Sequence, residues 1–100
     1  MRKLTPNEAA TAKETRRIRA LVRRNAKRKG FESFDVQLGE DWTHDPAVYI
    51  SFYLDPDYPT DNASIDALLQ VKDRVKDALY KAGVDRIAYV KYRDREPATR

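Results

Sequence analysis

Cysteine is absent from this chain of 100 residues, glycine occurs three times, and histidine and tryptophan occur once each. Without thiols the sequence excludes disulfides and thiolate chemistry, which fits a reducing compartment. The glycines are isolated, so no phosphate-cradling loop is expected. No apolar run approaches the ~18 residues that a membrane span needs, and the basic start is not followed by the apolar stretch of a signal peptide. We therefore predict a single cytoplasmic domain over residues 1–100 that does not enter a membrane.

Acidic residues and the one histidine gather between Glu40 and Asp45, a segment that also holds Trp42 and His44. An imidazole among carboxylates invites a catalytic or metal-binding interpretation. Metal sites normally need three or four converging ligands, however, and the chain has no second histidine and no cysteine. We expect no metal, no cofactor and no enzymatic activity. We interpret the segment as a polar turn in which Trp42 covers the edge of the core, with hydrolase chemistry around His44 as a minor alternative.

Charge is abundant and unevenly distributed along the chain. Residues 1–29 hold eleven lysines and arginines against two glutamates, a net charge of +9, whereas residues 30–100 have a net charge of −5. Such asymmetry predicts a basic element that faces something acidic. The acidic partner is nucleic acid, another protein, or the rest of this domain.

The basic part of the chain has the signals of one long helix. Thr5-Pro6-Asn7-Glu8 matches a capping box with proline at the first helical position, and Gly30 provides a left-handed stop. These signals predict about seven turns, at 3.6 residues per turn. A projection at 100° per residue separates a narrow apolar stripe from a broad basic face. The stripe consists of Ile18, Leu21, Val22 and Ala26.

Eight cations share the other half of this helix: Lys13, Arg16, Arg17, Arg19, Arg23, Arg24, Lys27 and Arg28. Cations gathered on one surface can neutralise phosphates, and the planar guanidinium group suits phosphate recognition. We predict that these residues bind nucleic acid. Two alternatives remain open, because a charge patch alone does not specify a ligand. One is an acidic protein partner, and the other is a solvated face that the acidic part of the domain partly neutralises.

Strands and a second helix are expected in the remainder of the chain. Residues 34–38 and 47–54 alternate with period two and predict a hairpin with a long loop over 39–46, and residues 86–93 predict a third strand. A proline-broken acidic loop precedes the second helix, which Gly83 ends. The apolar residues of this helix that recur at helical spacing are Ile65, Leu68, Leu69, Val75, Leu79 and Ala82.

The order αββαβ predicts an α+β fold, a three-stranded sheet with two helices on one face. A right-handed crossover makes the third strand parallel to the second. If the third strand lies beside the first, the first strand is central in an antiparallel sheet. We expect the side of the second strand that carries Val48 to face the helices. Residues 1–30 then form the basic helix, 31–93 a ββαβ body and 94–100 a flexible tail.

Three tyrosines, Tyr49, Tyr53 and Tyr89, are candidates for an interface on the open face of the sheet. Such a platform can stack unpaired bases. Aromatic sheet faces also bury against another subunit, so we favour a protein interface, which includes a homodimer through this face.

Two resemblances to known proteins add further expectations. The run from Leu38 to Val48, LGEDWTHDPAV, resembles a hairpin of small uncharacterised bacterial α+β proteins, in which a helix and a last strand follow. This resemblance spans about the central half of the chain and implies companions of HEPN-type or other defence and toxin–antitoxin genes, but it implies no active site. The order αββαβ with a basic first helix also resembles the type II KH arrangement of ribosome-binding factor A. The Gly-x-x-Gly loop of KH domains is absent here, so the resemblance does not imply KH-style backbone clamping.

Taken together, these patterns predict a non-enzymatic binding domain that contacts RNA or DNA phosphates through its first helix. The alternative is a protein-interaction module, antitoxin-like or part of a defence system, in which the basic helix binds an acidic protein surface.

Overall fold

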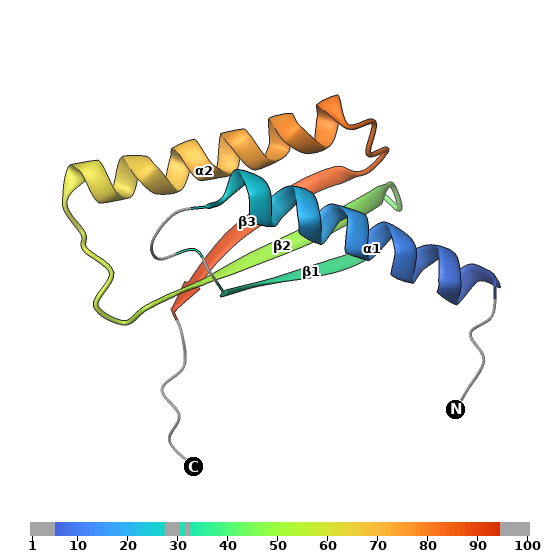
Figure 1. Cartoon of the computed structure of the whole chain (residues 1–100), viewed down its shortest axis with the longest axis horizontal. Helices are drawn as coiled ribbons and strands as arrows, with labels where there is room; N and C mark the ends of the chain where they lie inside the picture. Colours follow the sequence, from blue (N-terminus) through green and yellow to red (C-terminus); the bar gives the residue numbers. More distant parts are fainter. Residues whose placement is uncertain (1–5, 28–30, 32, 95–100) are drawn as a thin grey trace, which may run out of the picture.

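The computed structural model describes residues 6–27, 31 and 33–94, and it shows the α+β fold that the sequence predicts (Figure 1). Both helices cover the same face of a three-stranded sheet, and the opposite face bears no helix of the described chain. Neither helix is long and apolar enough to cross a lipid bilayer. The elements are α1 (Pro6–Asn25), β1 (Ser33–Glu40), β2 (Pro46–Leu54), α2 (Asn62–Lys81) and β3 (Ile87–Asp94).

Strand β2 lies at the centre of the sheet, which has the order β1-β2-β3. It is antiparallel to β1 and parallel to β3, so Ile50 is flanked by Val36 and Val90. The parallel pairing of β2 and β3 is as predicted. Strand β3 lies beside β2 and not beside β1, so the condition under which β1 would be central is not met. The central position suits β2, because its alternate side chains are buried over its whole length. The crossover through α2 then returns the chain to the neighbouring position in the sheet.

The β1–β2 hairpin is tighter than the sequence predicts, because both strands extend into the expected loop. The pairing continues to Glu40 and Pro46. Beyond it the Asp41 amide donates to the Asp45 carbonyl at 3.0 Å, and the His44 amide donates to the Asp41 carbonyl at 3.0 Å. His44 has a φ of 67°, in the left-handed region. These features describe a three-residue loop, a type I turn followed by one left-handed residue.

Helix α1 ends at Asn25, before the predicted stop at Gly30. The Asn25 side chain donates to the Leu21 carbonyl at 2.8 Å, which is the kind of local bond that competes with helix continuation. Phe31, a few residues after the end of this helix, is buried in the core. Thr5 and Gly30 themselves lie outside the described residues. The predicted apolar stripe is confirmed, since Ile18, Val22 and Ala26 are buried and Leu21 packs beside them.

Helix α2 buries a face that agrees with the predicted one at Val75 and Leu79 and differs from it in the first half of the helix. Its buried residues recur every fourth position: Ala67, Val71, Val75 and Leu79. Ile65 and Leu69, predicted on this face, are 42% and 57% exposed, and Leu68 is half-buried. Ile65 and Leu69 are apolar, which favours burial, yet at 100° per residue both lie well away from Val71. Gly83, with a φ of 76°, follows the helix as predicted.

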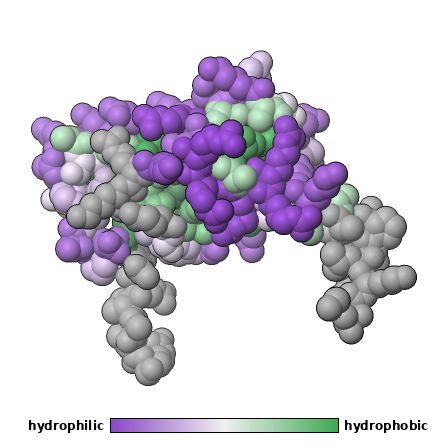
Figure 2. All heavy atoms as spheres, viewed as in Figure 1, coloured by the Kyte–Doolittle hydropathy of each residue, from purple (hydrophilic) through white to green (hydrophobic). Residues whose placement is uncertain are grey.

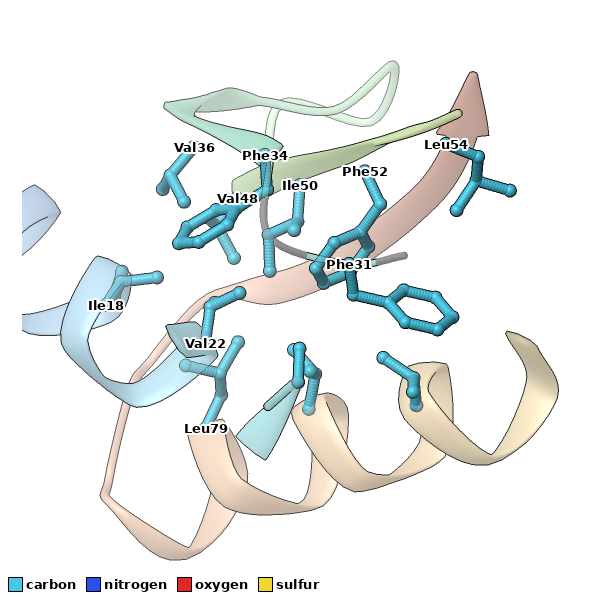
Figure 3. Packing of buried hydrophobic residues seen from close by; sticks show 13 residues of the cluster. Ile18, Val22, Phe31, Phe34, Val36, Val48, Ile50, Phe52, Leu54 and Leu79 are labelled. Carbon is cyan, nitrogen blue, oxygen red and sulfur yellow. The ribbon is translucent and has the colours of Figure 1, made fainter. Parts of the chain in front are cut away.

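The core lies between the helices and the sheet (Figure 3). Val48, Ile50 and Phe52 of β2 are fully buried under the helices, which confirms the predicted orientation of that strand. Phe31 meets Phe52 edge-on at 5.7 Å between ring centroids, and Tyr92 of β3 stacks on Phe52 at the same distance. Only Asp94 of the predicted tail is described, and it belongs to β3.

Candidate nucleic-acid interface

The outer face of α1 and the turn after it present exposed cations that no carboxylate neutralises by contact. No ion pair involves any of them within the described part of the chain. In the view of Figure 1, hydrophilic residues cover most of this side of the molecule (Figure 2). The exposed cations are Lys13, Arg16, Arg17, Arg23, Arg24 and Lys27. Arg28, also predicted to bind nucleic acid, lies outside the described residues.

The cations at the flanks of this face contact the protein itself. The guanidinium groups of Arg19 and Arg23 lie 5.0 and 5.8 Å from the centre of the Phe34 ring, which they cover as cation–π contacts. On the other flank Arg17 donates a hydrogen bond to the Ala82 carbonyl, just beyond the end of α2. Arg17 and Arg19 therefore also position α1. Lys13, Arg16, Arg24 and Lys27 have no such contact among the described residues and are available to a ligand.

Among the described residues, no carboxylate of the remainder of the domain forms an ion pair with a cation of this face. Glu14, the described carboxylate on α1, pairs with Arg86 at the start of β3 and not with a cation of α1. The same guanidinium donates to the carbonyls of Gly39 and Ala47 at 3.1 and 3.0 Å. Neither Glu14 nor Arg86 belongs to a local motif, so their contact could not be predicted from the sequence.

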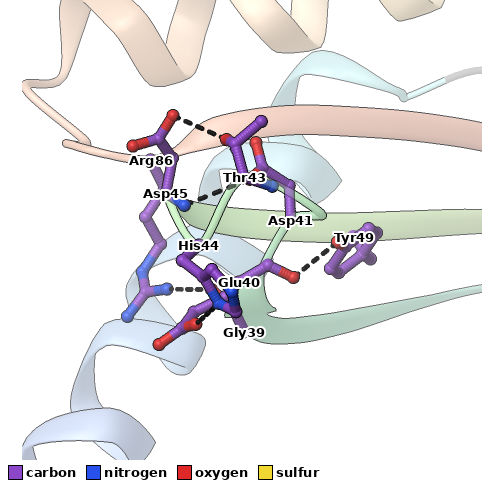
Figure 4. A network of polar contacts seen from close by, with 8 residues as sticks. All are labelled: Gly39, Glu40, Asp41, Thr43, His44, Asp45, Tyr49 and Arg86. Carbon is purple, nitrogen blue, oxygen red and sulfur yellow. Dashed lines mark hydrogen bonds and ion pairs between the residues drawn. The ribbon is translucent and has the colours of Figure 1, made fainter.

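The hairpin turn is organised by Asp41, whose side chain is buried (Figure 4). One carboxylate oxygen accepts from the Thr43 hydroxyl, the Thr43 amide and the Asp45 amide at 2.6, 2.8 and 3.1 Å. The other accepts from the Tyr89 hydroxyl at 3.0 Å. The Thr43 hydrogen bond is the main cause that lowers the pKa of Asp41 to about 2, against the opposing effect of burial.

The other aromatic side chains of this turn, those of Trp42 and His44, are exposed. Trp42 is 88% exposed, so the prediction that it covers the edge of the core is wrong: with a three-residue loop, its side chain projects beyond the sheet. The exposed His44 ring places Nδ1 3.2 Å from Glu40 Oε2. Within the described ranges no three histidine, cysteine, aspartate or glutamate side chains form a group that could hold a metal ion.

Tyr49, Tyr53 and Tyr89 all lie on the open face of the sheet, opposite to the core-facing residues. Tyr49 and Tyr89 stack on each other, with ring centroids 5.4 Å apart and an interplanar angle of 18°. Each hydroxyl donates to the protein: Tyr49 to the Glu40 carbonyl at 2.7 Å and Tyr53 to the Asp35 carboxylate at 2.8 Å, while Tyr89 donates to Asp41. The tyrosines are therefore held in one orientation without a ligand.

Comparisons with known proteins show the fold of this chain and no more. No protein-family model matches the sequence, and no curated protein matches it. A solved structure from work on the mode of action of CzrB, a candidate zinc transporter, is similar with a TM-score of 0.59 and 17% sequence identity. The match covers 94% of this chain and 100% of that chain. At this identity the likeness supports the α+β architecture alone.

Proposed function

We propose that this chain is a non-enzymatic, cytoplasmic nucleic-acid-binding domain whose helix α1 contacts RNA or DNA phosphates. The observation that carries the proposal is the set of exposed cations on the outer side of α1 that have no carboxylate partner in the described chain. Each contact between such a cation and a phosphate releases condensed counterions, which favours binding without regard to sequence. From Lys13 to Arg24 the helix rises about 16 Å, which is enough to face several phosphates.

Arginine outnumbers lysine among the exposed cations of this face, and this composition favours phosphate over other anions. Arg16 and Arg24 present planar guanidinium groups that can donate two parallel hydrogen bonds to one phosphate. Because Arg19 and Arg17 hold α1 against β1 and against the end of α2, the exposed cations are mounted on a fixed helix. Less ordering is then needed when a ligand binds.

The test is a titration of the purified protein with a labelled short DNA duplex and a labelled RNA hairpin, at about 0.15 M salt. We expect both to bind, and we expect the variant Arg16→Gln/Arg24→Gln to bind both more weakly. The matched control is Arg74→Gln/Lys76→Gln, which removes the same charge from the exposed side of α2. If neither ligand binds even at a protein concentration of about 10⁻⁴ M, the weak end for non-specific contacts, the proposal is wrong.

A protein-interaction module is the second candidate, and the exposure of Trp42 favours it. Aromatic residues are enriched in protein–protein interfaces, and this indole is almost wholly accessible at the tip of the hairpin. In this function the basic face of α1 binds an acidic protein, in keeping with the resemblance to companions of toxin–antitoxin and defence genes. Capture of an acidic partner that Trp42→Ala abolishes, with no binding of nucleic acid, would favour this candidate.

A further inference from the structure

The open face of the sheet has a hollow of about 280 Å³ on the side away from α1 and α2. This volume is close to the ~300 Å³ at which small-molecule pockets begin. All three strands contribute side chains to its lining, so a ligand there contacts the rigid centre of the sheet. The residues that line it are Gln37, Tyr49, Ile50, Ser51, Tyr89, Lys91 and Arg93.

One part of the lining is aromatic and already fixed in place. The Tyr49 and Tyr89 rings stack across β2 and β3, and their hydroxyls donate to the Glu40 carbonyl and the Asp41 carboxylate. A flat ring that enters the hollow therefore meets aromatic side chains that lose little freedom on binding. The polar ends of the tyrosines are engaged, so their rings remain as the contact surface.

Another part of the lining is cationic. Lys91 and Arg93 lie two residues apart on β3 and are exposed, and neither has a carboxylate partner in the described residues. Asp35, the carboxylate of β1 on this face, accepts the Tyr53 hydroxyl. The hollow thus pairs an aromatic wall with an excess of positive charge, and its complement is a flat aromatic ring attached to an anion.

We propose that this hollow binds an unpaired nucleotide of single-stranded RNA or DNA. Its base contacts Tyr49 and Tyr89, and its phosphate contacts Lys91 and Arg93. A paired base cannot enter, because its faces and edges are occupied within the duplex. A protein partner fits less well, because lysine is depleted in the cores of protein interfaces. This site deepens the proposed function and shares with it only the premise that the ligand is nucleic acid, since α1 lies on the opposite side of the sheet.

The test measures the binding of a labelled mixed-sequence single strand that is too short to form a duplex or hairpin. Four variants are compared with the wild type: Lys91→Gln/Arg93→Gln, Tyr89→Leu, Tyr89→Phe and the α2 control Arg74→Gln/Lys76→Gln. We expect the loss of the ring in Tyr89→Leu to weaken binding by roughly 5- to 150-fold, the range for one stacked base. Tyr89→Phe keeps the ring and loses only the bond to Asp41, so it should bind nearly as the wild type does.

The possible results distinguish binding in the hollow from binding by α1. Loss of single-strand binding in the first two variants, with duplex binding unchanged, supports the hollow. Duplex binding without any single-strand binding overturns the hollow and leaves the function of α1 intact. Single-strand binding that survives both variants also overturns it. A dimer that Tyr89→Leu dissociates, with single-strand affinity unchanged, identifies this face as a subunit interface and overturns the proposal as well. Thermal unfolding of each variant checks that the comparison is between folded proteins.

Discussion

Arg86 and Glu14 form an ion pair, with Nε 3.0 Å from Oε2, although 72 residues separate them in the chain. The guanidinium group also donates to the carbonyls of Gly39 on β1 and Ala47 on β2. Arg86 therefore joins α1 and both strands of the hairpin to the start of β3. Such a contact holds the basic helix at a fixed place above the sheet.

Replacement of Arg86 by Gln should lower the free energy of unfolding by about 1–3 kcal/mol, because two partly buried carbonyls lose a charged donor. Glu14 contributes less, since its side chain is 36% exposed and solvent screens the pair. Urea denaturation checks this, with Arg74→Gln as the control that should change stability by less than about 0.5 kcal/mol. Equal effects of the two substitutions would contradict the assignment. Arg86→Lys should also be destabilised, because an ammonium group cannot reproduce the guanidinium fork.

Two leucines of α2 should respond differently to truncation. Leu79 is 2% exposed and belongs to the core, so Leu79→Ala should cost about 2–5 kcal/mol. Leu68 is half-buried, so Leu68→Ala removes less contact and should cost less. Denaturant midpoints of the two variants, measured side by side, test the order. A larger loss for Leu68→Ala would contradict the burial that the structure gives these two side chains.

His44 adopts a left-handed backbone conformation that glycine tolerates better than any other residue. The strain of such a conformation in a non-glycine residue is about 1–2 kcal/mol. His44→Gly should therefore leave stability unchanged or raise it slightly, since the greater freedom of glycine in the unfolded chain offsets part of the gain. His44→Val, with a branched side chain in the same conformation, should be less stable than the wild type. The midpoint temperatures of thermal unfolding of His44→Gly, His44→Val and the wild type test this order. Loss of nucleic-acid binding in a stable His44→Gly protein would show a functional role for the imidazole.

Local periodicity explains which parts of this fold the sequence predicts. The helical spacing of Ile18 and Val22 identifies the buried side of α1, and the alternation of Val48 and Ile50 identifies the buried side of β2. Both patterns arise within a few residues, so they need no knowledge of neighbours. The placement of β2 at the centre depends on pairing with two strands distant in sequence, which periodicity does not encode.

The candidate sites also differ in whether they depend on local sequence or on the pairing of distant strands. The basic face of α1 is a property of one helix, so the sequence locates it. The hollow requires Tyr89 and Lys91 of β3 to lie beside Tyr49 of β2, an arrangement that depends on the parallel register. The hydrogen bond that Asp41 accepts from the Tyr89 hydroxyl likewise joins residues that are 48 positions apart in the chain. The sequence pattern therefore indicates the tyrosines of this face but not the cations that lie beside them.

Acid should weaken the hairpin through Asp41. Hydrogen bonds from Thr43 and Asp45, and the hydroxyl of Tyr89, hold the pKa of this carboxylate at about 2 in the folded protein, below its ordinary value of 3.8. A depressed folded pKa contributes stability that is fully present above the ordinary value and is lost as the pH falls through about 2. Asp41→Asn removes the charge at every pH. The difference in unfolding free energy between wild type and Asp41→Asn, from urea unfolding, should therefore shrink as the pH falls from 3.8 to about 2. A constant difference would contradict this role.

Because the proposed contacts of α1 are with phosphates, the affinity for duplex DNA should fall as the salt concentration rises. The logarithm of the association constant for duplex DNA should fall with the logarithm of salt concentration at about −0.9 per phosphate neutralised. Arg16 and Arg24 are the residues to change, because both are exposed, whereas Arg19 and Arg23 also cover Phe34 and their loss would disturb packing. Glutamine keeps a similar helix propensity, so α1 should remain folded.

The slope for Arg16→Gln/Arg24→Gln should be smaller in magnitude than that of the wild type by about two, one for each phosphate contact removed. Arg74→Gln/Lys76→Gln lowers the net charge equally but leaves α1 intact, so it should keep the wild-type slope. An equal reduction in both variants would mean that overall charge, and not the face of α1, attracts the duplex. Circular dichroism of the two variants confirms that the helices are retained, which leaves the loss of specific phosphate contacts as the cause of the change in slope.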